Sequence, residues 1–178
     1  MKYRGYRVDL VVTLALLTLL VLVGGQAAYG RVFVERPLLE ELRSIPGVMT
    51  VSIEKVAANY NITMDLAAGS NFPTLYRQAT EVAQQALGSS RFNLQIIDNR
   101  TTTLENLYRQ MQIHIEEAVA QGNFSVAAKK INEIAEQARV QASFYVDEER
   151  VYLELHQNDA YLYAVRHRIF PQKGVATI

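Results

Sequence analysis

The run LVVTLALLTLLVLV, residues 10–23, decides how the rest of this chain is organised. It carries no charge, and its only polar side chains are two threonines. Small and apolar residues continue as far as Gly30, interrupted only by Gln26. At about 1.5 Å per residue, a helix from Leu10 to Gly30 is about 30 Å long, which matches the hydrocarbon core of a bilayer. We therefore expect this segment, residues 10–30, to be a transmembrane helix or a signal peptide.

A short basic segment precedes the run, as in export signals, and it holds Lys2, Arg4 and Arg7. The small residues between 25 and 30 offer signal peptidase a place to cleave, so a cleaved signal peptide is one alternative. Apolar residues continue beyond this point, at 32–34, and a helix-like stretch follows them. We therefore favour the other alternative, an uncleaved signal anchor that keeps the protein in the membrane.

Lysine and arginine usually remain on the cytoplasmic side of such a segment. Three basic side chains precede the segment and three follow it closely, namely Arg31, Arg36 and Arg43. The upstream charges are the more tightly clustered, and the α-amino group adds to them. We therefore expect residues 1–9 to be a short cytoplasmic tail and the folded domain to be extracytoplasmic in the cell membrane.

The composition limits the classes of function. The chain has 178 residues, and its formal net charge is zero, with 18 basic and 18 acidic side chains. A nucleic-acid-binding protein needs an excess of positive charge to face phosphates, so we expect no nucleic-acid partner. Cysteine is absent, which excludes disulfides, thiolate metal sites and cysteine nucleophiles.

After the apolar run, the sequence predicts a helical neck over residues 31–46, which ends at Pro46-Gly47. Alternating residues then predict two antiparallel strands, at 48–53 and 60–66, each with one buried face. In the first strand this face is expected to hold Met49, Val51 and Ile53. Apolar residues at helical spacing predict a helix from Pro73 to Gly88, and a third strand follows at 92–96. The order is β-β-α-β.

The second half begins with Thr102 and Glu105, which have the spacing of a helix capping box. Two helices separated by Gly122-Asn123 then form an αα-hairpin. Three short strands follow, at 144–146, 151–155 and 161–169, and form an antiparallel meander in which Leu155 faces Leu162. The fold class is therefore α+β, with one extracytoplasmic domain over residues 47–170 and a tail at 171–178.

No motif for catalysis or metal binding is recognisable. His114 has no second histidine at i+3 or i+4, and the meander register puts His156 and His167 at opposite ends of the last hairpin. The paired carboxylates are residues of helix surfaces and of one turn, where a general acid and base would not be held in different environments. We expect no enzyme activity, no catalytic or metal-binding residues and no cofactor.

Asp98, Asn99 and Arg100 form the most suggestive polar triplet. They follow a strand and precede a capped helix, where open α/β folds often bind ligands. Aspartate and asparagine are also common in ordinary turns, where they bind nearby amides, and this is the simpler interpretation. We retain the triplet as a candidate ligand corner.

The final hairpin offers the candidate interface. One face of it is apolar, with Leu153 and Leu155 among its residues, and is expected to be the core face. The opposite face is unusually aromatic, and we call it the tyrosine face. It comprises Tyr152, Glu154, His156, Tyr161, Tyr163 and Val165. Either the αα-hairpin covers this face or it binds a partner, because aromatic anchors on a rigid sheet are typical of interface centres.

These observations favour a non-enzymatic, single-pass membrane protein. It is expected to act as a scaffold or accessory subunit through a protein partner or a homo-oligomer, with Tyr152, His156, Tyr161 and Tyr163 as candidate contacts. The alternative is an extracytoplasmic module that binds or senses a small ligand at Asp98 to Arg100.

Overall fold

The computed structural model describes residues 2–3, 6–57 and 59–168, and it describes side-chain surroundings for 10–21, 33–57 and 59–168. The chain is a mixed α+β protein with two three-stranded sheets. The side chains of residues 1–9, which include the basic segment, and the tail at 171–178 lie outside the described residues.

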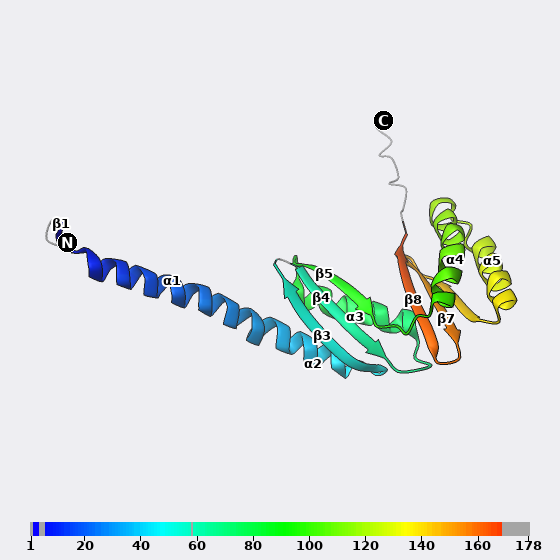
Figure 1. The fold of residues 1–178 in the computed structure, drawn as a ribbon, viewed down its shortest axis with the longest axis horizontal. Helices are drawn as coiled ribbons and strands as arrows, with labels where there is room; N and C mark the ends of the chain where they lie inside the picture. The colour runs from blue at the N-terminus through cyan, green and yellow to red at the C-terminus, as the bar shows by residue number, and fades with distance from the viewer. Residues whose placement is uncertain (1, 4–5, 58, 169–178) are drawn as a thin grey trace, which may run out of the picture.

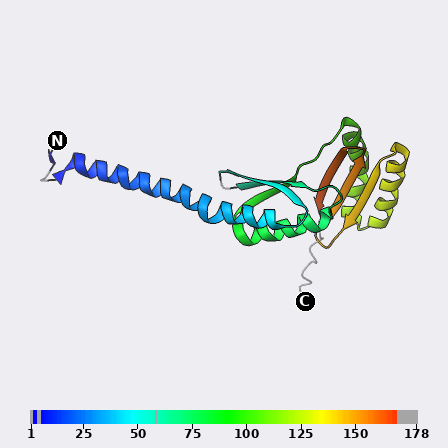
Figure 2. The ribbon, with the colours of Figure 1, turned by 90° about the horizontal axis from the view of Figure 1, so that it is seen from below.

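A single long helix, α1 (Val8–Gly30), leads into the rest of the chain. Two very short paired strands precede it, β1 (Lys2–Tyr3) and β2 (Tyr6–Arg7). Figures 1 and 2 both show α1 extending away from the sheets as an isolated rod. Among the residues described, no helix combines the length and the apolar character needed to cross a membrane.

A π-helical turn, η1 (Arg31–Glu35), joins α1 to α2 (Arg36–Ser44). The stretch expected as a neck is thus helical, but α2 does not stand apart from the domain. Leu38 and Leu42 are fully buried in the first core, because α2 packs beside β3 and α3.

The first unit contains α2 and a sheet of β3 (Val48–Val56), β4 (Asn59–Leu66) and β5 (Arg91–Ile96). Strand β4 lies in the centre, antiparallel to β3 and parallel to β5, and α3 (Phe72–Leu87) makes the crossover. The alternation predicted for β4 is confirmed, because every second residue from Tyr60 to Leu66 is buried. Met49 was expected beside Val51 in the core, but a register irregularity between Val48 and Thr50 leaves it 64% exposed.

The second unit contains α4 (Thr102–Gln121), α5 (Phe124–Ala138) and the meander β6 (Gln141–Val146), β7 (Arg150–Gln157) and β8 (Ala160–His167). The predicted αα-hairpin and meander are both confirmed, although β6 begins at Gln141 rather than Phe144. Leu155 faces Leu162 as predicted, and the turn between β7 and β8 is the two-residue loop Asn158-Asp159.

The two units have separate cores that meet at the second sheet. Its apolar face packs on α4 and α5, with Leu153 and Leu155 inside. Its tyrosine face points toward α3, and Tyr152 belongs to the core of the first unit. The second sheet therefore lies between the αα-hairpin and α3, and both of its faces are at least partly covered.

Candidate functional site: the junction of the two sheets

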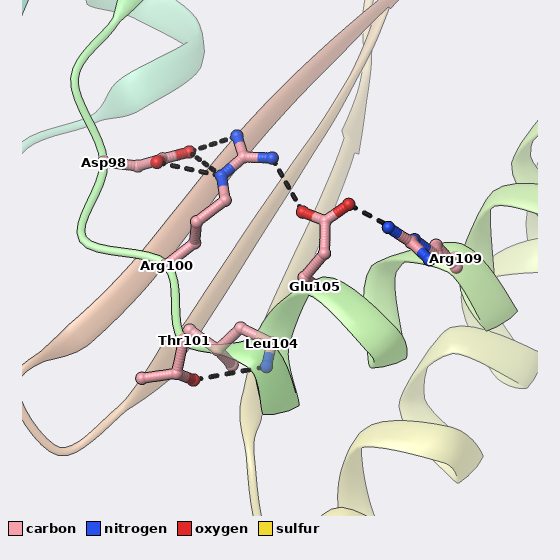
Figure 3. Close-up of polar contacts among 6 residues, drawn as sticks. All are labelled: Asp98, Arg100, Thr101, Leu104, Glu105 and Arg109. Atoms are coloured by element: carbon pink, nitrogen blue, oxygen red, sulfur yellow. Dashed lines mark hydrogen bonds and ion pairs between the residues drawn. The ribbon is translucent and has the colours of Figure 1, made fainter.

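Within the polar triplet after β5, the side chains of Asp98 and Arg100 bind each other. Arg100 Nε donates hydrogen bonds to both carboxylate oxygens of Asp98, at 2.9 and 3.0 Å, and Arg100 Nη2 also binds this carboxylate. Arg100 Nη1 donates to Glu105 Oε2 at 2.9 Å, and Glu105 in turn lies 3.4 Å from Arg109 Nε (Figure 3). The hydrogen bond to Asp98 raises the pKa of Arg100, and the hydrogen bond from Arg100 lowers the pKa of Glu105.

The helix cap beside this cluster differs from the prediction. Thr101, not Thr102, is the N-cap of α4, and its hydroxyl accepts a hydrogen bond from the amide of Leu104 at 3.3 Å (Figure 3). A capping box needs the acidic residue three positions after the cap. Glu105 is four positions after Thr101, so its carboxylate binds arginine instead of the cap amide.

Asn99 joins the two units. Its amide donates to the carbonyl of Tyr161 at 3.1 Å, and its carbonyl accepts from the amide of Tyr161 at 3.2 Å. The side chain adds a third bond, from Asn99 Nδ2 to the carbonyl of Asp159 at 3.1 Å. The triplet therefore links the end of β5 to β8, and most of its polar groups already have partners within the protein.

Tyr152, at the centre of the tyrosine face, is fully buried. Its ring lies edge-on to the rings of Phe72 and Tyr76 on α3, with centroids 5.7 and 6.0 Å apart, respectively. Its hydroxyl donates to Asp147 Oδ2 at 2.7 Å. Burial, reinforced by this bond, raises the pKa of Tyr152 to about 12. A partner cannot reach Tyr152 in the intact fold, and the element that covers it is α3 rather than the αα-hairpin.

The other candidate contacts remain half-buried at the surface. His156 Nε2 lies 2.6 Å from Glu154 Oε1, and its ring stacks on Tyr161 with centroids 6.1 Å apart. The Tyr163 ring packs against the Phe72 ring, with their centroids 4.7 Å apart. Burial, and then the charge of Glu154, raise the pKa of Tyr163 to about 12. His156, Tyr161 and Tyr163 thus form a continuous aromatic patch on a rigid sheet.

A shallow cleft of about 280 Å³ brings the two sequence-predicted sites together. Arg100 and Tyr163 both line it, although they lie far apart in the chain. Sequence reasoning missed Phe72 and Tyr76, which also line the cleft and belong to α3. The only local signal was an aromatic residue directly before Pro73, at the start of a predicted helix.

The histidines do not assemble into a reactive centre. His114 lies on α4, His156 faces Tyr161, and His167 faces Arg150 at the far end of the hairpin, as the predicted register required. In the part of the chain that the structure describes, no three His, Asp or Glu side chains are grouped so that they could hold a metal ion. No family model matches this chain, and no curated protein matches it in sequence.

Proposed function

We propose that this chain is a non-enzymatic, membrane-anchored scaffold or accessory subunit whose extracytoplasmic domain works through protein–protein contacts. The observation that carries the proposal is the exposed apolar surface of α1. The leucines and valines from Leu10 to Val21 are between 51% and 72% exposed, and they lie on all sides of the helix. A helix that is apolar all round is stable only when lipid or protein surrounds it.

Lipid is the better candidate for this surrounding. The sequence remains uncharged from Leu10 to Gly30, and the basic residues lie outside this segment on both sides. Such a distribution is typical of a segment in hydrocarbon with its charged flanks in the headgroups. Cleavage near residues 25–30 is the competing outcome, and a retained Met1 in the mature protein would exclude it.

The half-exposed aromatic patch supports the second part of the proposal. His156, Tyr161 and Tyr163 present ring surface whose backbone is held by β7 and β8, so little entropy is lost when a partner packs against it. Glu154 places a carboxylate beside the rings. We infer that a protein partner, or a second copy of the chain, binds at this patch.

Site-specific photocrosslinking in cells tests the contact. Benzoylphenylalanine at position 161 should capture a partner or a second copy, whereas the same residue at position 113 should not. Ile113 is a suitable control because it is 70% exposed on α4 and is not part of the patch. Equal capture from both positions, or capture from neither, would contradict the proposed contact.

The absence of cysteine makes the topology directly testable. In the variant Ile113→Cys, a membrane-impermeant maleimide should label intact cells, because the domain is proposed to be extracytoplasmic. Labelling only after lysis would place the domain inside and reverse the proposed orientation.

A small-ligand module is the alternative, and the cleft at the junction favours it. The cleft is near the lower end of the roughly 300–1,000 Å³ found for ligand sites. Among the described residues that line the cleft, only Arg100 carries a guanidinium, and the carboxylates of Asp98 and Glu105 already pair with it. A ligand would have to displace Asp98 or Glu105, which makes this function the second choice.

A further inference from the structure

The closed end of the β3–β4 hairpin lies on the side of the first unit from which α1 arrives. Helix α2 and strand β3 run in opposite directions, because only residues 45–47 join them, and they pack against each other. Ile53 of β3 lines a shallow hollow together with Glu35 and Leu39, so it lies beside the start of α2. Figures 1 and 2 show the hairpin continuing from there toward α1.

The lengths of the elements place the hairpin end more closely. Strand β3 continues for three residues beyond Ile53, as far as Val56. Such a stretch of strand spans about 10 Å, and a helix covers that distance in about seven residues. The segments α1, η1 and α2 follow one another without a break. Counting back that many residues from Glu35 and Leu39 therefore puts Val56 level with residues 28–32, where α1 ends and η1 begins.

The two chain segments at this end carry basic side chains and no acidic ones. Residues 55–60 read KVAANY, and residues 88–93, which lead into β5, read GSSRFN. The segments are neighbours, because β4 and β5 are parallel and start side by side. Lys55 and Arg91 are exposed, and neither forms an ion pair within the part of the chain that the structure describes. Lys55 Nζ lies 5.1 Å from the centre of the Tyr60 ring.

Exposed apolar side chains accompany the basic ones. Val56, at the end of β3, is 50% exposed, and Phe33 of η1 is 64% exposed at nearly the same level. Surfaces of this composition bind anionic lipid, because the basic groups face the phosphates while the apolar groups enter the headgroup region. A bilayer around residues 10–30 would surround α1 on every side, and its surface would lie close to this end of the hairpin.

We propose that the closed end of the β3–β4 hairpin, with Lys55, Val56 and Arg91, rests on the surface of a bilayer that contains anionic phospholipids. This inference rests on the proposed membrane anchor, because the bilayer is the one around α1, but it does not depend on the orientation of the anchor. The domain is then held to the membrane at two points, α1 and the hairpin end, and this limits how far it can tilt about η1.

Single-cysteine labelling tests this contact, because the chain has no cysteine of its own. The full chain is placed in nanodiscs of phosphatidylcholine and phosphatidylglycerol, with an NBD fluorophore at Val56→Cys, Leu20→Cys or Ile113→Cys. Leu20 is 72% exposed on α1, and Ile113 is 70% exposed on α4. A nitroxide on the lipid headgroup should quench the label at position 56 at least about threefold more than the label at position 113. A nitroxide in the middle of the acyl chain should quench the label at position 20.

Failure of the hairpin contact and failure of the anchor give different results. Strong quenching at position 20, with equally weak quenching at 56 and 113, would leave the anchor in place and overturn the hairpin contact. Absence of quenching at position 20 would refute the anchor, and the hairpin contact would be refuted with it.

Charge variants test the requirement for anionic lipid. Lys55→Gln combined with Arg91→Gln should reduce the headgroup quenching at position 56 to nearly that at position 113. The reason is that each basic side chain favours contact with an anionic surface roughly fivefold, so losing both weakens the contact about tenfold or more. Arg109→Gln combined with Lys129→Gln, which removes exposed basic side chains of the αα-hairpin, should leave this quenching unchanged. Equal quenching in the two double variants would overturn the proposal.

Discussion

Phe72 is the residue through which α3 holds the second sheet, and replacing it with alanine is the sharpest test of that packing. The ring is 1% exposed. Its centroid lies 5.7 Å from that of Tyr152 and 4.7 Å from that of Tyr163, both on the second sheet, and 6.1 Å from that of Tyr76 on its own helix. Phe72→Ala would therefore remove contacts within the first core and between the two units at once.

The expected cost follows from this burial. Truncation of a buried phenylalanine to alanine costs about 3–5 kcal/mol, and each ring pair contributes about 0.5–1.5 kcal/mol within that sum. Because domains are stable by only about 5–15 kcal/mol, Phe72→Ala should lower the denaturant midpoint greatly. Ile113→Ala, at a residue 70% exposed on α4, should change stability by no more than about 0.5 kcal/mol.

Urea unfolding of the full chain in detergent micelles, followed by far-ultraviolet circular dichroism, measures both variants. A double-mutant cycle with Phe72→Leu and Tyr152→Leu isolates the contact between the units, for which we expect a coupling of about 0.5–1.5 kcal/mol. The packing account would be refuted if Phe72→Ala cost no more than Ile113→Ala, or if the two leucine substitutions were simply additive.

Three further predictions concern groups with defined environments. In the folded protein Tyr152 and Tyr163 should ionise near pH 12, above the ordinary tyrosine pKa of about 10, as absorbance at 295 nm would record. Because these two folded-state pKa values are raised, stability should fall as pH rises from about 10 to 12, and a single transition near pH 10 would contradict the burial. Hydrogen bonds from Tyr152 and two backbone amides outweigh burial and lower the pKa of Asp147, so its contribution is present above about pH 4 and is lost as pH falls through the lower folded-state value. The variant Asp147→Asn should therefore lose less stability than the unmodified protein between pH 5 and 2, because it lacks the pH-dependent contribution of this one carboxylate. If stability depended on pH in the same way in both proteins, this account of Asp147 would be contradicted. Gly122 ends α4 in the left-handed conformation, with a φ of 76°. The variant Gly122→Ala should therefore lower the free energy of unfolding by about 1 kcal/mol, measured by heat or urea. An unchanged free energy of unfolding would contradict the left-handed conformation at this helix end.

The sequence was informative wherever the signal was local. The alternation from Tyr60 to Leu66 predicted a one-sided strand, and all four apolar residues of that face are buried. The register of Leu155 against Leu162 followed from the apolar alternation of the two strands, because a slip of one residue would have turned the core face outward. The prediction that Met49 is buried was wrong, because an irregularity in strand pairing cannot be predicted from alternation alone.

The candidate site was predictable only in part, because its decisive contacts join distant segments. The aromatic character of one hairpin face singled out Tyr152 and Tyr163, but not that Phe72 would cover the first and half-cover the second. Likewise, a turn was expected at Asn99, but its pairing with Tyr161 on another sheet leaves no trace in local composition. The burial of Arg150 could not be predicted, because nothing in the local sequence distinguishes a buried arginine from an exposed one.

Extraction of the full chain from cell membranes with alkaline carbonate tests the central proposal most directly. The unmodified protein should remain in the membrane pellet. Leu16→Arg combined with Leu20→Arg should release it, because each arginine at the centre of a membrane helix costs about 2.5–3.5 kcal/mol. Ile113→Arg, which adds the same charge to an exposed position on α4, should remain in the pellet. Recovery of the unmodified protein in the soluble fraction would contradict the anchored-subunit account.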